Sequence, residues 1–254
     1  SPVLWKDYVL VNASAVGRQL VAVEQSTGKI AWKIQDDSFT NTWSSPVTVR
    51  TDDGDRALFG VPAKIIAVDP ASGKQIWTAD TPLDDAVCGS ICVRDNVAYI
   101  MGGQSGRAIA IRMGGEGDVS ETHTLWRSPL RAGICTPVLA GKNLHWCSGG
   151  IFYAADCETG EYVYKTRLPR IGRPTGVFPN ADYSSPIVSG ETIVQFTRSG
   201  ESYVIASGDE FKTVAHNRRF DEDESSFSST SAIADGQLFV RSERFLYCIA
   251  SPKN

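Results

Sequence analysis

The chain repeats one pattern of hydrophobic and polar residues: an apolar run, a polar turn, and a second apolar run that ends in a large aromatic residue. The clearest copy is Ile65–Trp77, in which Pro70 and Gly73 frame the turn. Proline presets φ at the start of a turn, and glycine accepts a positive φ at its end. An apolar–turn–apolar segment of this kind predicts a β-hairpin.

Similar hairpins recur along the chain. Val21–Trp32 and Tyr153–Tyr164 are close copies, Ile109–Trp126 has an enlarged turn, and Val204–Ala206 and Cys248–Ala250 are weaker matches. The residues expected at the strand centres are spaced by 45, 43, 44, 51 and 44 positions, and they are Ala22, Ala67, Ala110, Ala154, Ile205 and Ile249. Such a period indicates a repeat architecture.

A second sequence motif, called the landmark below, precedes each hairpin and predicts another strand. Its copies are Ser1-Pro2-Val3, Ser45-Pro46-Val47, Thr136-Pro137-Val138 and Ser185-Pro186-Ile187, with the degenerate forms Gly89-Ser90-Ile91 and Thr230-Ser231-Ala232. A polar turn and a further β run follow each copy, so each repeat has four strands. Four antiparallel strands in about 44 residues are typical of a β-propeller blade. We therefore predict an all-β propeller in a single domain, with repeats at residues 1–42, 43–87, 88–134, 135–183, 184–228 and 229–254.

Large aromatic residues fall at matching places on the fourth strand of successive repeats. A four-stranded sheet has two apolar faces, which stacked blades bury against each other. We expect these aromatics and the turn glycines to dock neighbouring blades, because each aromatic side chain brings a large area to bury. The residues are Trp32, Trp77, Trp126, Tyr164, Gly28, Gly73 and Gly160.

The last repeat has three predicted strands and lacks the aromatic fourth one. The chain begins at Ser1 in the middle of the landmark, with no upstream strand to complete a blade. Propellers commonly close by completing one blade with strands from both chain ends. We therefore expect residues before Ser1 in the full protein and a ring of seven or eight blades, rather than a six-bladed ring that ends in a three-stranded blade.

Composition removes several classes of function. The net charge is −4 without a basic block, so nucleic acid is not an expected partner. The sequence has no apolar run of about 18 residues that would span a membrane. It has six cysteines but no C-x-x-C motif, and its three histidines are scattered, so zinc is not expected. We expect all six thiols to be unbridged.

The hairpin motif resembles the tryptophan-docking repeat of quinoprotein-type (pyrroloquinoline-quinone-like) β-propellers. The matching residues are Ala22, Val23, Thr27, Gly28, Lys29 and Trp32 in the first repeat, Ala67, Val68, Asp69, Ser72, Gly73, Lys74 and Trp77 in the second, and Ala154, Asp156, Thr159 and Gly160 in the fourth. The resemblance covers essentially the whole chain, although the third, fifth and sixth repeats are degenerate. No Trp-Asp dipeptide closes any repeat, which argues against a WD40 propeller.

The resemblance implies two functional classes. Its dehydrogenases bind pyrroloquinoline quinone with calcium under a disulfide between adjacent cysteines, and this sequence has no adjacent cysteines. The acidic run Asp221–Glu224 is one contiguous loop, which is more typical of a solvated surface than of a calcium cage. The sequence therefore resembles the cofactor-free outer-membrane assembly lipoprotein type more closely. That type implies a location in the periplasm or cell envelope and leaves room for a membrane anchor upstream of Ser1.

Two functions stay open at this point. The first is a non-catalytic propeller scaffold, without cofactor or metal, that binds protein or polysaccharide through one loop face. The alternative is a quinone-dependent dehydrogenase, or a fragment of one. The longest predicted face loop has the arginine and aromatic composition of a binding hot spot, in Arg170, Arg173, Phe178 and Tyr183. Small residues before each landmark would form a polar ring if they pointed to the propeller axis, and they are Ser44, Cys88, Cys135, Ser184 and Ser229.

Overall fold

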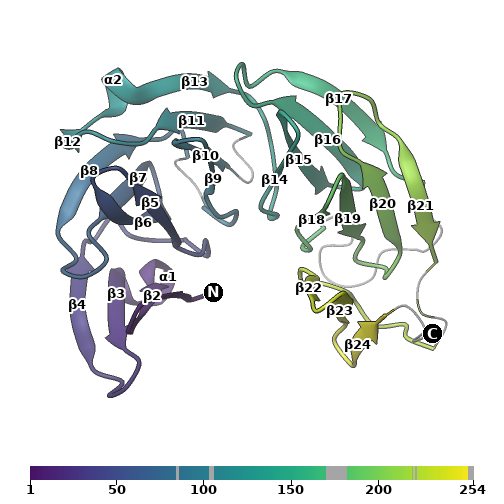
Figure 1. The fold of residues 1–254 in the computed structure, drawn as a ribbon, viewed down its shortest axis with the longest axis horizontal. Coiled ribbons are helices and arrows are strands. Elements are labelled where there is room, and N and C mark those ends of the chain that lie inside the picture. Colours follow the sequence, from purple (N-terminus) through teal and green to yellow (C-terminus); the bar gives the residue numbers. More distant parts are fainter. Residues whose placement is uncertain (84–85, 103–105, 170–181, 219, 221, 251–254) are drawn as a thin grey trace. The chain divides into compact units, whose positions relative to one another are not determined.

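The computed structural model describes residues 1–83, 86–102, 106–169, 182–218, 220 and 222–250 (Figure 1). They form two compact units. Unit 1 is Ser1–Arg131 with Glu158–Gly160, and unit 2 is Ala132–Cys157 with Glu161–Asn254. Apart from two single-turn helices, α1 (Ser14–Gly17) and α2 (Ser120–His123), every element is a β-strand. The predicted all-β class is confirmed.

Unit 1 contains three β-sheets, numbered here in chain order. Within each sheet the main strands follow one another in sequence and pair antiparallel. Sheet 1 is β1 (Val3–Trp5), β2 (Tyr8–Asn12), β3 (Gln19–Glu24) and β4 (Ile30–Gln35). Sheet 2 is β5 (Val47–Thr51), β6 (Gly54–Val61), β7 (Lys64–Val68) and β8 (Gln75–Asp80), and sheet 3 is β9 (Cys92–Arg94), β10 (Val97–Met101), β11 (Ala108–Arg112) and β13 (Thr124–Ser128).

Unit 2 repeats the same antiparallel order in three further sheets. Sheet 4 is β14 (Val138–Ala140), β15 (Asn143–Ser148), β16 (Ile151–Asp156) and β17 (Tyr162–Arg167). Sheet 5 is β18 (Ile187–Ser189), β19 (Thr192–Phe196), β20 (Ser202–Ala206) and β21 (Thr213–Asn217). Sheet 6 is β22 (Ala232–Ala234), β23 (Gln237–Arg241) and β24 (Leu246–Ile249), and it has three strands among the described residues, as the sequence predicted.

The enlarged turn of the third repeat forms an additional strand. Strand β12 (Gly117–Asp118) leaves sheet 3 and pairs parallel with β8 of sheet 2, so that Gly117 faces Trp77 and Asp118 faces Thr78. The amide of Val119 donates to the carbonyl of Thr78 at 2.9 Å, and the Asp80 amide donates to Ser120 Oγ at 2.8 Å. The insertion therefore covers the fourth strand of the preceding sheet, which the sequence did not predict.

One β-bulge recurs in sheets 1 to 5. The extra residue always lies just before the position of the docking aromatic on the fourth strand, as Ala31 does before Trp32. A bulge bends its strand and re-aims the next side chain. The same register corrects two predicted strand centres: Val204 and Cys248, not Ile205 and Ile249, occupy the place of Ala22. The spacing predicted as 51 residues is therefore 50.

Hydrophobic residues of neighbouring sheets fill the space between them within each unit. In β6, Leu58 belongs to the core shared with sheet 3, whereas Phe59 belongs to the core shared with sheet 1, and both are fully buried. Successive residues of a strand point to opposite faces, so a strand buried on both sides is apolar at every position. This explains the uninterrupted apolar run that ends β6, and unit 2 has equivalent cores between sheets 4 and 5 and between sheets 5 and 6.

The landmark hydroxyls join neighbouring sheets. The amide of Ser45 donates to Ser90 Oγ at 2.9 Å, and in unit 2 the amides of Thr136 and Ser185 donate to Ser185 Oγ and Thr230 Oγ1 at 2.8 and 3.0 Å. The structure thus aligns Ser90-Ile91-Cys92 with Ser45-Pro46-Val47, because Cys92 pairs with Tyr99 as Val47 pairs with Leu58. The predicted alignment of Gly89-Ser90-Ile91 was wrong by one residue.

No disulfide joins any of the six cysteines, all of which lie in the described residues. Burial raises the pKa of the Cys135 thiol to about 12, so this thiol stays protonated and donates to the backbone carbonyls of Ala132 and Cys147. Cys248 is the one exposed cysteine. None of the described helices is long and apolar enough to cross a membrane.

Candidate binding face

Each sheet has two ends, which differ in the loops that they carry. One end carries the loop between the second and third strands and the connection to the next sheet. We call this end the loop face. The opposite end, with the turn between the first two strands and the hairpin between the last two, is called the hairpin face. Backbone hydrogen bonds join the two kinds of loop on the loop face: the amide of Asp36 donates to Arg18, and the amide of Thr81 donates to Ala63.

Trp43 is the largest exposed aromatic side chain of the loop face in unit 1. It is 58% exposed, although its backbone is fixed on both sides. The Trp43 amide donates to the Val87 carbonyl at 2.8 Å, and the Val87 amide donates to Asn41 at 3.1 Å. Thr42, which is 1% exposed, forms a parallel bridge with Val87. Two successive connections therefore fix the backbone of one residue whose large aromatic side chain is exposed to solvent.

Asn12 links this tryptophan loop to helix α1. Its Nδ2 donates to the Gly60 carbonyl at 3.1 Å and to Ser44 Oγ at 3.4 Å, and its Oδ1 accepts from the Ser14 amide at 3.3 Å. Ser44 also donates to Gly60 at 3.0 Å. Val16 of α1 is 97% exposed on the same face. Trp43 and Val16 thus present apolar surface above a polar network that fixes their backbones.

In unit 2 only part of the predicted hot-spot loop lies within the described residues. Arg170, Arg173 and Phe178 lie outside the described residues. Tyr183 is described, and the guanidinium of Arg198 lies 4.9 Å from the centre of its ring, in cation–π geometry. Arg198 belongs to the loop after β19, and the amide of Phe227 donates to its carbonyl at 2.9 Å. Tyr183 thus pairs with an arginine of another loop, and the predicted binding role of the Leu168–Tyr183 loop stays a prediction.

The small residues predicted as an axis ring have individual structural roles. Ser44 bonds to Gly60, Cys135 donates to two carbonyls, and the carbonyl of Ser184 accepts from Gln195 Nε2 at 3.1 Å. Ser229 accepts from Arg241 Nε at 2.9 Å. The register of sheet 3 puts Gly89, not Cys88, at the position of Ser44. The side chains of Ser44, Cys135 and Ser229 are thus used in local hydrogen bonds.

One residue of the acidic loop, Asp223, differs from the solvated surface expected of the run, whereas Glu222 and Glu224 are exposed as expected. Asp223 is 1% exposed, and it accepts from the amide and hydroxyl of Ser225 at 2.9 and 2.6 Å and from Tyr247 Oη at 2.7 Å. Burial acts to raise the pKa of this carboxyl, but the hydrogen bonds outweigh it and hold the pKa well below the usual range. Asp223 anchors its loop to β24 of sheet 6. No group of three or more metal-ligating side chains occurs among the described residues.

The docking aromatics lie on the hairpin side of the sheets. Trp32 packs over Gly73, where an added Cβ would lie 2.6 Å from Trp32 Cδ2, and its Nε1 donates to the Pro70 carbonyl at 2.9 Å. Trp126 packs over Gly160 in the same way, at 2.7 Å. In unit 2, Tyr164 instead contacts Phe211, with ring centres 5.9 Å apart, and His145. A Cβ on Gly28 would meet nothing within 4 Å.

Comparisons with known proteins agree with this architecture. Comparison with curated proteins gives no match. Among solved structures, BamB from Moraxella catarrhalis matches with a TM-score of 0.74 at 15% identity, over 97% of this chain and 70% of that one. Sqt1 of Saccharomyces cerevisiae matches with a TM-score of 0.68 at 11% identity, over 95% and 67%. A quinohemoprotein alcohol dehydrogenase from Pseudomonas putida matches with a TM-score of 0.56 at 13% identity, over 85% and 41%.

The repeats, their bulges and their tryptophan docking define a β-propeller of the pyrroloquinoline-quinone-like repeat class. A family model described as outer membrane protein assembly factor BamB matches residues 2–166. The chain therefore belongs to the BamB family of this class. The expected resemblance to that type is confirmed, and the likeness to the dehydrogenase is more distant.

Proposed function

We propose that the protein is a non-catalytic scaffold that binds a protein partner through the loop face that carries Trp43. A protein partner is preferred to a polysaccharide because the family model bears the description of a protein assembly factor. We further propose that the partner is a component of outer-membrane protein assembly and that the protein acts in the periplasm.

The observation that carries this proposal is the combination of an exposed side chain and a hydrogen-bonded backbone at Trp43. Tryptophan is enriched at binding hot spots, where it fills a pocket of the partner. Binding costs less when the contact residue is already ordered, and the backbone hydrogen bonds around Trp43 provide this order. More than half of the Trp43 surface is available to a partner, because the residue is 58% exposed.

Replacing Trp43 with alanine tests the proposal. We expect the recovery of the bound assembly component from envelope extract to fall by about tenfold or more, because a central tryptophan commonly contributes this much. The matched control is Ile30→Ala, since Ile30 is 56% exposed but lies on the hairpin face. Equal recovery with both variants, or a loss with Ile30→Ala alone, would contradict the proposed face.

The dehydrogenase alternative has its own experiment. The chain is mixed with pyrroloquinoline quinone and calcium, and the absorbance spectrum is recorded during titration. The scaffold proposal expects no saturable spectral change and no alcohol- or sugar-dependent reduction of an electron-accepting dye. A stoichiometric change accompanied by dye reduction would overturn it in favour of the enzyme.

A further inference from the structure

Trp77 is a buried docking tryptophan whose indole N–H has no hydrogen-bond partner among the described residues. Trp77 is 1% exposed, and among the described residues no hydrogen-bond acceptor is assigned to its Nε1. The equivalent Trp32 donates from Nε1 to the backbone carbonyl of Pro70. An indole N–H that meets no acceptor in the protein can donate to water or to a ligand in the space that it faces. The two tryptophans occupy the same position in neighbouring sheets and differ in this one bond.

The insertion of the third repeat explains the difference. Opposite Trp32, a short turn brings a carbonyl and Gly73 against the indole. Opposite Trp77, the chain instead passes through Gly114 and Gly115, with φ of 127° and 77°, before it forms β12. An added Cβ on Gly114 would meet nothing within 4 Å. At Trp77 the place that the Pro70 carbonyl takes against Trp32 is therefore left as open space beside Gly114.

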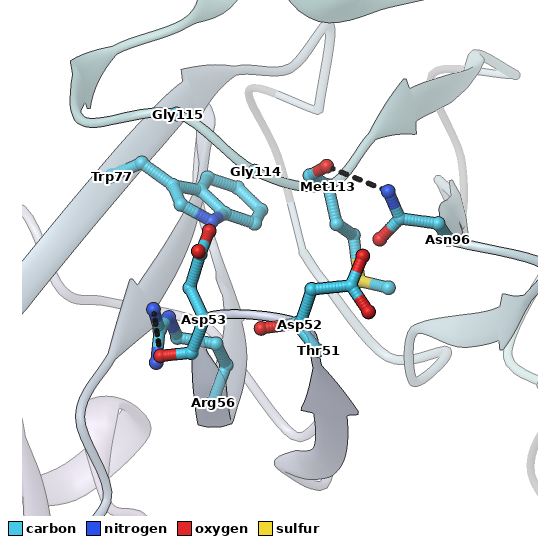
Figure 2. Close-up of a pocket in the computed structure, with 9 residues that line it drawn as sticks. All are labelled: Thr51, Asp52, Asp53, Arg56, Trp77, Asn96, Met113, Gly114 and Gly115. Carbon is cyan, nitrogen blue, oxygen red and sulfur yellow. Dashed lines mark hydrogen bonds between the residues drawn. The ribbon is translucent and has the colours of Figure 1, made fainter.

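This space is a small pocket of about 60 Å³, partly open to solvent, on the hairpin face between sheets 2 and 3 of unit 1 (Figure 2). Figure 2 shows the nitrogen-bearing edge of Trp77 turned toward the side chain of Asp53, with no hydrogen bond between them. The remaining walls come from both sheets. The side chains that matter here are Asp52, Asp53, Arg56 and Trp77 of sheet 2 and Asn96 and Met113 of sheet 3.

The charged groups of the pocket are unequally available. Arg56 is engaged by backbone carbonyls, through Nη1 to Asp55 at 2.9 Å and Nη2 to Asp53 at 3.1 Å. Asn96 donates from Nδ2 to the Met113 carbonyl at 3.1 Å. The side chains of Asp52 and Asp53 are exposed at the rim. A ligand therefore meets one unused N–H donor at depth and two carboxylates at the entrance.

We propose that this pocket binds a basic peptide segment of a protein partner. A backbone carbonyl of the peptide accepts from Trp77 Nε1, as Pro70 does from Trp32. A lysine or arginine side chain next to that carbonyl lies between Asp52 and Asp53, where charge-assisted hydrogen bonds are the strong ones. The site lies on the face opposite Trp43, so it is a second contact, independent of the proposed scaffold interface.

The indole N–H resonance of Trp77 reports directly on this bond. In ¹⁵N-labelled protein the six tryptophans give separate indole signals, and Trp77→Phe identifies that of Trp77. The probes are the capped tripeptides acetyl-Gly-Lys-Gly-amide and acetyl-Gly-Glu-Gly-amide, and N-acetylglucosamine. We expect the lysine peptide alone to move the Trp77 signal downfield in a saturable way, and the effect to weaken at high salt because the carboxylates attract the cation.

Variants separate the two halves of the site. We expect the double variant Asp52→Asn, Asp53→Asn to weaken lysine-peptide binding about tenfold, since it removes the charge from the hydrogen bonds. The control is Asp7→Asn, because Asp7 is an exposed carboxylate in the corresponding turn of sheet 1 and its replacement should leave binding unchanged.

The absence of a saturable shift, an equal response to the glutamate peptide, or a response to the sugar alone would each overturn the proposal. The proposal would also be overturned if Asp53→Ala shifted the Trp77 signal in the absence of peptide and the lysine peptide caused no shift. That result would show that Asp53 itself accepts the N–H. Trp43→Ala is expected to lose envelope partners but to bind the lysine peptide normally. The two proposals can therefore be refuted independently of each other.

Discussion

Gly73→Ala is expected to destabilise unit 1 far more than the same substitution at Gly28. Both glycines occupy the same turn of the repeat with nearly identical φ, 71° and 70°. An L-residue in this left-handed region costs roughly 1–2 kcal/mol, and this cost applies to both sites. At Gly73 the added methyl group would also lie 2.6 Å from Trp32, whereas at Gly28 it would meet nothing within 4 Å.

The difference between the two variants isolates the docking contact. Forcing an extra methyl group into packed surroundings costs about 1–3 kcal/mol, so Gly73→Ala should lose about 2–5 kcal/mol in total. The loss of unfolded-state freedom is the same for both substitutions and cancels in the comparison. Urea unfolding followed by far-UV circular dichroism measures both. If the two variants unfolded at the same urea concentration, tryptophan docking would not contribute to the stability of the fold.

The second large effect is a pH dependence caused by His145. His145 is fully buried in sheet 4, its ring centre lies 6.1 Å from that of Phe152, and its Nδ1 is 3.2 Å from Tyr164 Oη. Burial lowers the pKa of His145 to about 4, and the backbone of Ala140 and the carboxylate of Asp209 oppose this only in part. The folded protein therefore excludes a proton that the unfolded chain binds below about pH 6.5.

The free energy of unfolding should consequently fall as the pH drops from about 6.5 to about 4. Above this window His145 is neutral in both states and contributes nothing to the pH dependence. Across it the loss amounts to roughly 3 kcal/mol, since each unit of pKa difference corresponds to about 1.4 kcal/mol. His145→Gln removes the titrating group, while the carboxylates that titrate near pH 4 stay in both proteins. Unfolding measured at several pH values should give a clearly shallower slope for the variant, and identical slopes would refute the assignment.

Local patterns were sufficient to predict the repeats. The turn glycines and alternating apolar runs predict the hairpins because turn geometry and the two faces of a strand act over a few residues. Exact register was harder to predict. Val204 and Ile205 are both β-branched and apolar, so the sequence does not distinguish which of them faces the fourth strand, and the bulge decides it. In sheet 3 the neighbouring residues Ile91 and Cys92 are likewise both apolar, and the predicted alignment of the landmark was wrong by one residue.

The sites depended on contacts that no short pattern contains. Trp43 lies in a largely polar loop, and its proposed role depends on the pairing of that loop with Val87, which is distant in the sequence. The enlarged turn of the third repeat was visible in the sequence, but its parallel pairing with β8 joins two different sheets. The open N–H of Trp77 follows from that pairing. Asp223 was expected at the surface because acidic runs usually are, and three hydroxyl or amide donors instead hold it in the interior.

Site-specific photo-crosslinking in the cell envelope tests the scaffold account most directly. A benzophenone amino acid replaces Trp43 on the loop face or Ile30 on the hairpin face, two positions of nearly equal exposure, 58% and 56%. The account predicts a crosslinked adduct from position 43 to a component of outer-membrane protein assembly, and no adduct to that component from position 30. Adducts to it from position 30 alone, or from neither position, would contradict the claim that the loop face binds a protein partner.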